Sequence, residues 1–146
     1  MGFSLRAARP EDVPFLTDVV VEATRDQGRL AADFDEAAFR ASYEAWSGQH
    51  LDSTSVIVVD DLPVGRLRVV RTPESIELAG LQLLPSHQGI GLGRLVLAGL
   101  QQESAAARIP IELSVERDNP GARAFYEREG FRLVAGTDTD DLLRWP

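Results

Sequence analysis

A short segment with three alternating glycines, Gln88-Gly89-Ile90-Gly91-Leu92-Gly93, has the composition of a backbone anion-binding turn. Glycine carries no Cβ, so backbone N–H groups in such a turn can approach a ligand closely. Where the turn enters a helix, unpaired N–H groups and the helix dipole favour phosphate. The segment alone predicts either a phosphate site or a tight connection between a strand and a helix.

Two common phosphate-binding motifs do not describe this segment. The dinucleotide fingerprint needs a third glycine three residues after the second, and Arg94 and Val96 occupy the two places where it would fall. That fingerprint also follows the first strand of a βαβ unit, whereas several strands are predicted before Gln88. The chain contains no Gly-Lys-Ser/Thr triplet, which excludes a P-loop.

A second segment, Asn119–Phe131, combines helix-end signals with a potential proton donor. Asn119 is a suitable N-cap, Pro120 fits the first helical position, and Gly130 fits the helix end. Tyr126 lies between these signals. A phenol has a pKa near ~10, so its hydroxyl is protonated at neutral pH and can act as a hydrogen-bond or proton donor. The alternative is a half-buried aromatic side chain without a chemical role.

The elements that position these segments follow from hydrophobic periodicity and turn residues. Strands are predicted over Phe3–Ala8, Thr54–Val59, Val64–Val70, Ile76–Leu84, Ile109–Val115, Phe131–Ala135 and Asp141–Trp145. Helices are predicted from Pro10 to at least Ala23, from near Asp35 past Trp46, over Gly91–Ala107 and over Pro120–Arg128. The fold class is therefore α/β of the α+β type, with a mixed, mostly antiparallel sheet of about seven strands and helices on both faces.

Side-chain positions follow from the same patterns. In the helix Gly91–Ala107, one side is predicted to carry Leu92, Leu95, Val96, Gly99 and Leu100. Helical spacing predicts that Tyr43 and Trp46 belong to the core. The segment Asp60–Pro63 is predicted to form a turn between two strands, and Ile109–Val115 to form a buried strand.

Composition limits the class of protein. The 146 residues predict a single domain, 1–146. The chain has no cysteine and two histidines, so no disulfide, thiol nucleophile or metal site is expected. A net charge of −8 argues against nucleic-acid binding, although it would suit a cationic substrate. No apolar run approaches the ~20 residues of a membrane helix, and no signal peptide is evident, so no membrane contact and a cytoplasmic location are expected.

Together the two segments resemble the GNAT superfamily of acyl-CoA-dependent N-acetyltransferases. The first motif, Gln-x-x-Gly-x-Gly, is matched by Gln88, Gly91 and Gly93. The second, Asn-x-x-Ala-x-x-Phe-Tyr-x-x-x-Gly-Phe, is matched without a gap by Asn119, Ala122, Phe125, Tyr126, Gly130 and Phe131. The order of predicted elements agrees from Phe3 to Trp145. The resemblance covers nearly the whole chain.

This resemblance implies acetyl-CoA as cosubstrate, in a cleft where Ile76–Leu84 and Ile109–Val115 splay apart. Leu81 and Leu83 would pair with the pantetheine arm as an added strand. The pyrophosphate would be held by Gln88, Gly89, Ile90, Gly91, Leu92, Gly93 and Arg94. Further cofactor contacts would come from Asn119, Ala122, Phe125 and Tyr126.

The implied reaction is attack of an amine on the thioester through a tetrahedral oxyanion. Tyr126 would be the acid that protonates the leaving thiolate, and the backbone N–H at Leu83 would stabilise the oxyanion. Either Glu77 or ordered water would deprotonate the amine. Glu77 has an equally good interpretation as a solvent-facing strand residue.

The acceptor is expected to be a small-molecule or peptide amine. Members that acetylate ribosomal-protein N-termini have Leu-Glu-Val where this chain has Leu113-Ser114-Val115, which argues against that group. An acidic entrance for a cation would use Asp26, Asp33, Asp35, Glu36, Asp138, Asp140 and Asp141, but solvated loops are the favoured interpretation of these residues. A non-catalytic acyl-CoA sensor, a scaffold without coenzyme A binding and a homodimer stay open.

Overall fold

The computed structural model describes residues 2–146, which form two compact units that we describe separately. Of the described residues, the first unit contains 2–68 and 80–92, and the second contains 69–79 and 93–146. Seven strands are hydrogen-bonded in the order β1-β2-β3-β4-β5-β7-β6. The pairs β1–β2, β2–β3, β5–β7 and β6–β7 are antiparallel, and β4–β5 is parallel. The predicted mixed, mostly antiparallel seven-stranded sheet is confirmed.

Strands β1 (Ser4–Ala7), β2 (Thr54–Val59) and most of β3 (Leu62–Arg71) belong to the first unit. Both β1–β2 and β2–β3 are antiparallel. Asp60 and Asp61 both have positive φ, 51° and 63°, as a two-residue hairpin requires. The predicted turn over Asp60–Pro63 is therefore too long: Pro63 lies inside β3, opposite Val58 and next to a register shift, where proline is tolerated.

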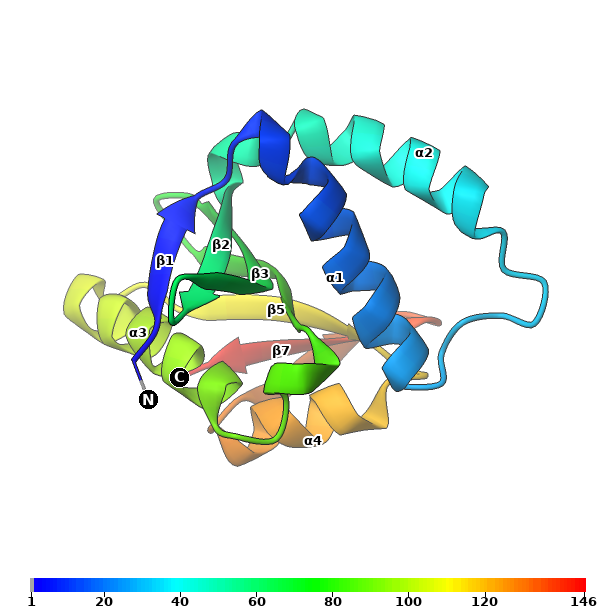
Figure 1. Ribbon diagram of the computed structural model, residues 1–146. Coiled ribbons are helices and arrows are strands. Elements are labelled where there is room, and N and C mark those ends of the chain that lie inside the picture. Colours follow the sequence, from blue (N-terminus) through cyan, green and yellow to red (C-terminus); the bar gives the residue numbers. More distant parts are fainter. Residues whose placement is uncertain (1) are drawn as a thin grey trace. The chain divides into compact units, whose positions relative to one another are not determined.

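Two helices complete the first unit. Helix α1 (Val13–Asp26) follows the 3-10 turn η1 (Pro10–Asp12), and helix α2 (Glu36–Gly48) precedes η2 (Leu51–Ser53). The long loop 27–35 joins α1 to α2 (Figure 1). The Asp35 carboxylate accepts a hydrogen bond from the Ala38 N–H at 3.0 Å, as its predicted N-cap role requires.

The second unit contains strands β5 (Ile111–Glu116), β6 (Arg132–Gly136) and β7 (Asp140–Trp145) and the beginning of β4 (Ile76–Leu83). Strand β7 pairs antiparallel with both β5 and β6. The parallel β4–β5 register consists of two pairs, Ile76 with Ile111 and Glu77 with Glu112. After Ala79, β4 passes from the second unit into the first.

Helix α3 (Leu92–Ala107) and helix α4 (Pro120–Arg128) also belong to the second unit, apart from Leu92. The Gln101 side chain on α3 donates a hydrogen bond to the Glu129 carbonyl just beyond α4, at 2.9 Å. The 3-10 turn η3 (Pro85–His87) lies between β4 and α3 in the chain.

On two helices the buried positions differ from the apolar ones expected from the sequence, because periodicity defines a helix face only approximately. On α3, Leu95 is 43% exposed and Gly99 is exposed, whereas Leu97 is fully buried. On α2, Tyr43 is half-buried and Trp46 is 39% exposed. Strand β5 is not buried on both faces: its burial alternates, with Ser114 exposed.

Within residues 2–146, no helix has the length and apolarity needed to span a bilayer.

Candidate functional site

The glycine-rich turn has the backbone geometry of a ligand-facing loop. Gly89 and Gly91 have φ of 74° and 84°, in the left-handed region that glycine adopts without strain. A Cβ at either position would meet no atom within 4 Å, so backbone conformation, and not crowding, requires glycine here. The space next to both residues is open, as close approach of a ligand to the backbone requires. The turn leads directly into α3, which begins at Leu92.

The turn is tied to the end of β4 by Gln88. Its side-chain amide donates a hydrogen bond to the Leu83 carbonyl at 2.9 Å, and the Leu84 N–H donates to the Val64 carbonyl on β3 at 2.8 Å. A Cβ at Gly65 would lie 2.7 Å from both the Gln82 carbonyl oxygen and a Leu83 methyl carbon, so only glycine allows this approach of β3 to β4. The first-unit residues Leu83 and Gln88, both predicted for cofactor binding, are thus brought into contact.

Glu77, the candidate base, is exposed near the start of β4 and lies opposite Glu112 of β5 in the parallel register. It belongs to the second unit, whereas Leu81 and Leu83 on the same strand belong to the first. Leu81 and Leu83 are both half-buried. The role of Glu77 as a base stays a prediction.

The second segment forms α4 with the predicted ends. Asn119 Oδ1 accepts a hydrogen bond from the Ala122 N–H at 3.2 Å, and the Gly130 φ of 95° follows the helix end. This cap holds Ala122 and the first turn in place. The strand β6 begins at Arg132, one residue after the predicted Phe131, which is buried.

Tyr126 lies on α4 between two aromatic rings. Its ring centroid is 5.1 Å from that of Phe125 and 5.5 Å from that of Phe131, both in edge-to-face geometry. Burial of the Tyr126 hydroxyl raises its pKa above the ordinary value. Within residues 2–146 this hydroxyl has no hydrogen-bond partner, and it is not among the enclosed polar atoms. Tyr126 is therefore protonated at neutral pH, and its role as an acid stays a prediction.

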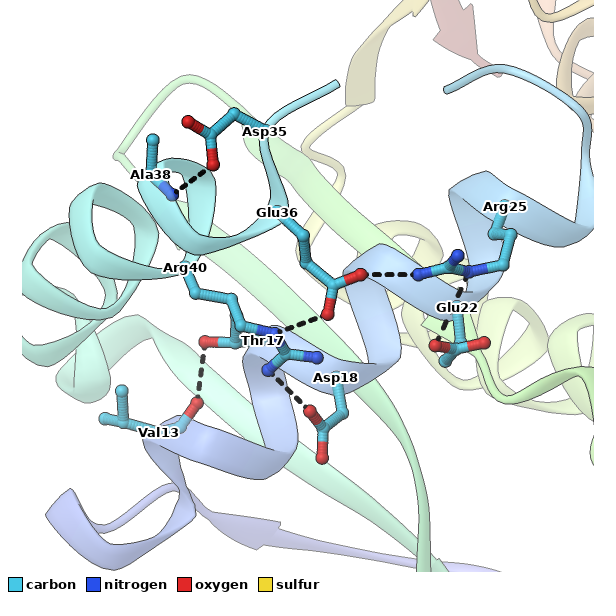
Figure 2. Close-up of polar contacts among 9 residues, drawn as sticks. All are labelled: Val13, Thr17, Asp18, Glu22, Arg25, Asp35, Glu36, Ala38 and Arg40. Atoms are coloured by element: carbon cyan, nitrogen blue, oxygen red, sulfur yellow. Dashed lines mark hydrogen bonds and ion pairs between the residues drawn. The ribbon is translucent and has the colours of Figure 1, made fainter. Parts of the chain in front are cut away.

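The predicted acidic residues at the beginning of α2 are engaged by neighbouring groups. Figure 2 shows Glu36 between two guanidinium groups, with Arg25 at 2.6 Å and Arg40 at 3.0 Å. Arg40 also contacts Asp18 on α1 at 2.7 Å. The pKa of Glu36 is lowered by the hydrogen bonds from Arg40 and Arg25. Because these contacts neutralise Glu36, it is not a free acceptor for a cationic substrate.

The acidic residues near the C-terminus are also engaged. Asp141 on β7 contacts Arg123 at 2.6 Å and Arg117 at 3.2 Å. Asp140 lines a pocket of about 510 Å³ whose other lining residues are Glu116, Arg117, Asp118 and Thr139. None of the predicted catalytic residues lines this pocket.

Sequence reasoning missed a buried arginine on β3. Arg66 is 4% exposed, and burial lowers the pKa of its guanidinium. Nη1 donates a hydrogen bond to the Gln82 side-chain oxygen at 2.8 Å, and the guanidinium carbon lies 5.8 Å from the centroid of the Tyr43 ring. The glycine that accommodates the guanidinium is Gly80, where a Cβ would collide with Nη1. The sequence gives no signal for this contact, because Gly80 looks like any other glycine in a strand.

Several known proteins are similar to this chain. The curated mycothiol acetyltransferase of Gordonia bronchialis is 52% identical over 52 residues, which is 35% of this chain and only 17% of that protein. The PaiA N-acetyltransferase of Thermoplasma acidophilum, solved in complex with coenzyme A, superposes with a TM-score of 0.83 at 19% identity over 99% of this chain and 98% of that one. An acetyltransferase from Thermus thermophilus gives a TM-score of 0.77 at 22% identity over 100% and 97% of the two chains.

The two solved structures establish the fold alone, because both sequence identities are low. The curated relative is matched over only a small part of its length. The decisive match is to the family described as Acetyltransferase (GNAT) family, which covers residues 16–131. That range begins within α1, includes the glycine-rich turn and the whole of α4, and ends at Phe131. This chain is a member of the GNAT acetyltransferase family.

Proposed function

We propose that this protein transfers an acetyl group from acetyl-CoA to a primary amine of a small molecule or peptide. The observation that carries the proposal is the glycine-rich turn, with its two left-handed glycines beside open space at the entry to α3. Membership of the family supports an acyl-CoA donor. The coenzyme A bound to the PaiA relative supports it further.

In this proposal, backbone N–H groups of residues 88–94 bind the pyrophosphate of the donor. Leu81 and Leu83 on β4 pair with the pantetheine arm through their backbones. Asn119, Ala122, Phe125 and Tyr126 contact the thioester end. These binding roles are assigned from the resemblance of each segment to the family.

The chemistry requires one bond to form and one to break. A neutral amine attacks the thioester carbonyl, and its lost proton goes to Glu77 or to water. The backbone N–H at Leu83 stabilises the resulting oxyanion. Collapse of the intermediate breaks the carbon–sulfur bond, and Tyr126 donates its proton to the departing thiolate.

Two glycine variants test the donor site. Gly91→Ala and Gly28→Ala each place a Cβ at a left-handed residue with open space around it, φ 84° and 68°, so both introduce similar backbone strain of about 1–2 kcal/mol. Only Gly91 belongs to the proposed site. Isothermal titration should show one-to-one acetyl-CoA binding to the wild type and to Gly28→Ala, and weaker binding to Gly91→Ala.

Turnover tests the assignment of Tyr126. Tyr126→Phe should lower kcat for thiol release with an amine panel by roughly 10²–10⁴-fold. Acetyl-CoA affinity should change little, since the ring remains. If the protein binds acetyl-CoA but acetylates no amine of the panel, an acyl-CoA sensor is favoured. Absence of acetyl-CoA binding by a folded protein would refute both the transferase and the sensor.

A further inference from the structure

Arg66 on β3 is a buried arginine whose side chain reaches across to β4. It is 4% exposed, and its Nη1 donates a hydrogen bond to the side-chain oxygen of Gln82 at 2.8 Å. The guanidinium also fills the space beside Gly80, where a Cβ would collide with Nη1. Arg66 therefore contacts β4 at residues 80 and 82, and all three residues belong to the first unit.

The rest of the Arg66 guanidinium is closed off by protein. Nε is enclosed and makes no hydrogen bond within residues 2–146, and the Tyr43 ring of α2 lies 5.8 Å from the guanidinium carbon. Burial lowers the pKa of Arg66, and the neighbouring Tyr43 partly opposes this effect. A buried cation of this kind is costly, and apolar side chains often replace such groups without loss of stability. Stability alone therefore does not account for this arginine.

The segment of β4 that Arg66 contacts is the one assigned to the donor. Gln82 lies between Leu81 and Leu83, whose backbones are proposed to pair with the pantetheine arm. The Leu84 N–H donates to the Val64 carbonyl on β3 at 2.8 Å. Because successive N–H groups of an extended strand point to opposite edges, the Leu83 N–H points away from β3. The two residue pairs between β4 and β5 lie at the start of β4, so this outer edge is the one that an added strand would use.

We propose that Arg66 is a positioning residue, which acts through Gln82 to hold the end of β4 in the orientation that binds the pantetheine arm. This role rests on the proposed acetyltransferase function. Arg66 contacts β4 and not the donor. A planar guanidinium fixes the direction of its hydrogen bond to Gln82, which an apolar side chain of similar length cannot do. The buried cation thus sets the alignment of the Leu81 and Leu83 backbones.

A purely structural role makes a different prediction. If Arg66 only supported folding, its replacement would change the folded fraction and would affect the binding of every ligand alike. In the positioning role, only ligands with a pantetheine arm are affected. ADP carries the pyrophosphate that residues 88–94 are proposed to bind, but it has no such arm. The ratio of acetyl-CoA affinity to ADP affinity therefore separates the two roles.

The first experiment is isothermal titration of acetyl-CoA and of ADP into the wild type and into Arg66→Met. The variant should bind acetyl-CoA about 10-fold more weakly, because the alignment of two backbone hydrogen bonds is lost. Its affinity for ADP should be unchanged. Equal weakening for both ligands, or unchanged acetyl-CoA affinity, overturns the positioning role.

Arg68→Met is the matched control. Arg68 lies two residues further along β3, and its guanidinium carbon is 5.0 Å from the centroid of the Trp46 ring. Its Nε donates to the Ser53 hydroxyl at 3.0 Å, so this hydrogen bond does not involve β4. The control should keep both affinities. A loss of acetyl-CoA affinity in Arg68→Met equal to that in Arg66→Met contradicts a specific role of Arg66.

The wild-type titrations distinguish failure of this inference from failure of the proposed function. If the wild type binds ADP and binds acetyl-CoA no more tightly, the pantetheine arm makes no productive contact, and the role of Arg66 is wrong. If the folded wild type binds neither ligand, the proposed function itself is refuted, and the inference fails with it.

Hydrogen exchange tests the positioning of β4 without any ligand. In Arg66→Met, the Leu84 N–H should exchange about 10-fold faster than in the wild type, because the end of β4 opens more often. The melting temperature should be unchanged or higher, since a costly buried cation is removed. Unchanged exchange at Leu84 shows that Arg66 does not hold this segment and overturns the proposal.

Variants of Gln82 test the route of the effect. Gln82→Met removes the acceptor and should weaken acetyl-CoA binding as Arg66→Met does, whereas Gln82→Glu keeps an acceptor for Nη1 and should retain the wild-type affinity. The double variant Arg66→Met/Gln82→Met should lose no more affinity than Arg66→Met alone, because both changes break one contact. Additive losses in the double variant contradict an action of Arg66 through Gln82.

Discussion

Tyr126 and Tyr43 are the two tyrosines of the chain, and each is placed where burial raises the pKa of its hydroxyl. Their surroundings differ. The Tyr126 hydroxyl is not enclosed, whereas the Tyr43 hydroxyl is enclosed beside the Arg66 guanidinium, which partly offsets the effect of burial on its pKa. Loss of either proton is therefore harder in the folded protein than in the unfolded chain.

Alkaline titration of tyrosinate absorbance checks both hydroxyl groups at once. Because both pKa values lie above the ordinary ~10, the folded protein should show little ionisation at pH 10, while the unfolded chain ionises there. The unfolded state then loses protons first, so stability should fall as pH rises above about 10. Ionisation of either tyrosine in the folded protein at or below its ordinary pKa would contradict this placement. The single-tyrosine variants Tyr126→Phe and Tyr43→Phe assign each transition.

At the scale of elements, the connection of β1 to α1 depends on one buried carboxylate. Asp12 is 7% exposed, and its two oxygens accept from Arg6 on β1 at 2.7 and 2.8 Å. It also accepts from the Arg9 backbone N–H at 2.8 Å. The hydrogen bond from Arg6 is the main cause that lowers the pKa of Asp12. This arrangement fixes the turn η1 against the preceding strand.

Asp12→Asn should therefore lower the free energy of unfolding by about 1–2 kcal/mol near neutral pH. Since the Asp12 pKa is lowered on folding, its contribution is present above the ordinary value of about 3.9 and is lost as pH falls through the lowered value. Denaturant unfolding as a function of pH should show the two proteins converging in acid. Glu11→Gln, at a neighbouring exposed carboxylate 3.4 Å from Arg9, should change stability little. A difference between Asp12→Asn and wild type that persists unchanged in acid would refute this account.

At the scale of the whole molecule, the two units are interleaved along the chain. The polypeptide passes between them after Arg68, after Ala79 and after Leu92. Strands β3 and β4 and helix α3 therefore each contain residues of both units. Neither unit is a continuous segment that can be removed from the other, so we expect one cooperative unfolding transition.

Acetyl-CoA should shift this transition if the proposed function is correct. At a ligand concentration 100 times Kd, binding to the native state adds about 2.7 kcal/mol, which raises Tm by about 5–10 °C for a chain of this size. Differential scanning calorimetry with and without acetyl-CoA measures the shift. Gly91→Ala should show a smaller shift than Gly28→Ala at the same ligand concentration. Two separate transitions, or no shift in wild type, would contradict this prediction.

The sequence by itself determined the order of elements, the caps at Asp35 and Asn119, the glycine-rich turn and the family. These features depend on residues close together in the chain: a cap needs an oxygen three residues before an N–H, and a positive φ favours glycine. Motif spacing is likewise a local property. Local patterns erred where they had to choose a helix face, as at Trp46 and Leu95.

Only the tertiary structure decided which charges are paired and which are buried. Glu36 is neutralised by Arg25, 11 residues away, whereas the buried Arg66 bonds to Gln82, 16 residues away, and has no ion pair within residues 2–146. Nothing in the local sequence distinguishes these arginines, because all 15 cationic side chains of the chain are arginine. Burial and ion pairing depend on distances between residues far apart in sequence, and electrostatic interactions change strongly with distance and solvent exposure. The proposed donor site is therefore evident in the sequence, whereas the burial of Arg66 is decided only in the folded chain.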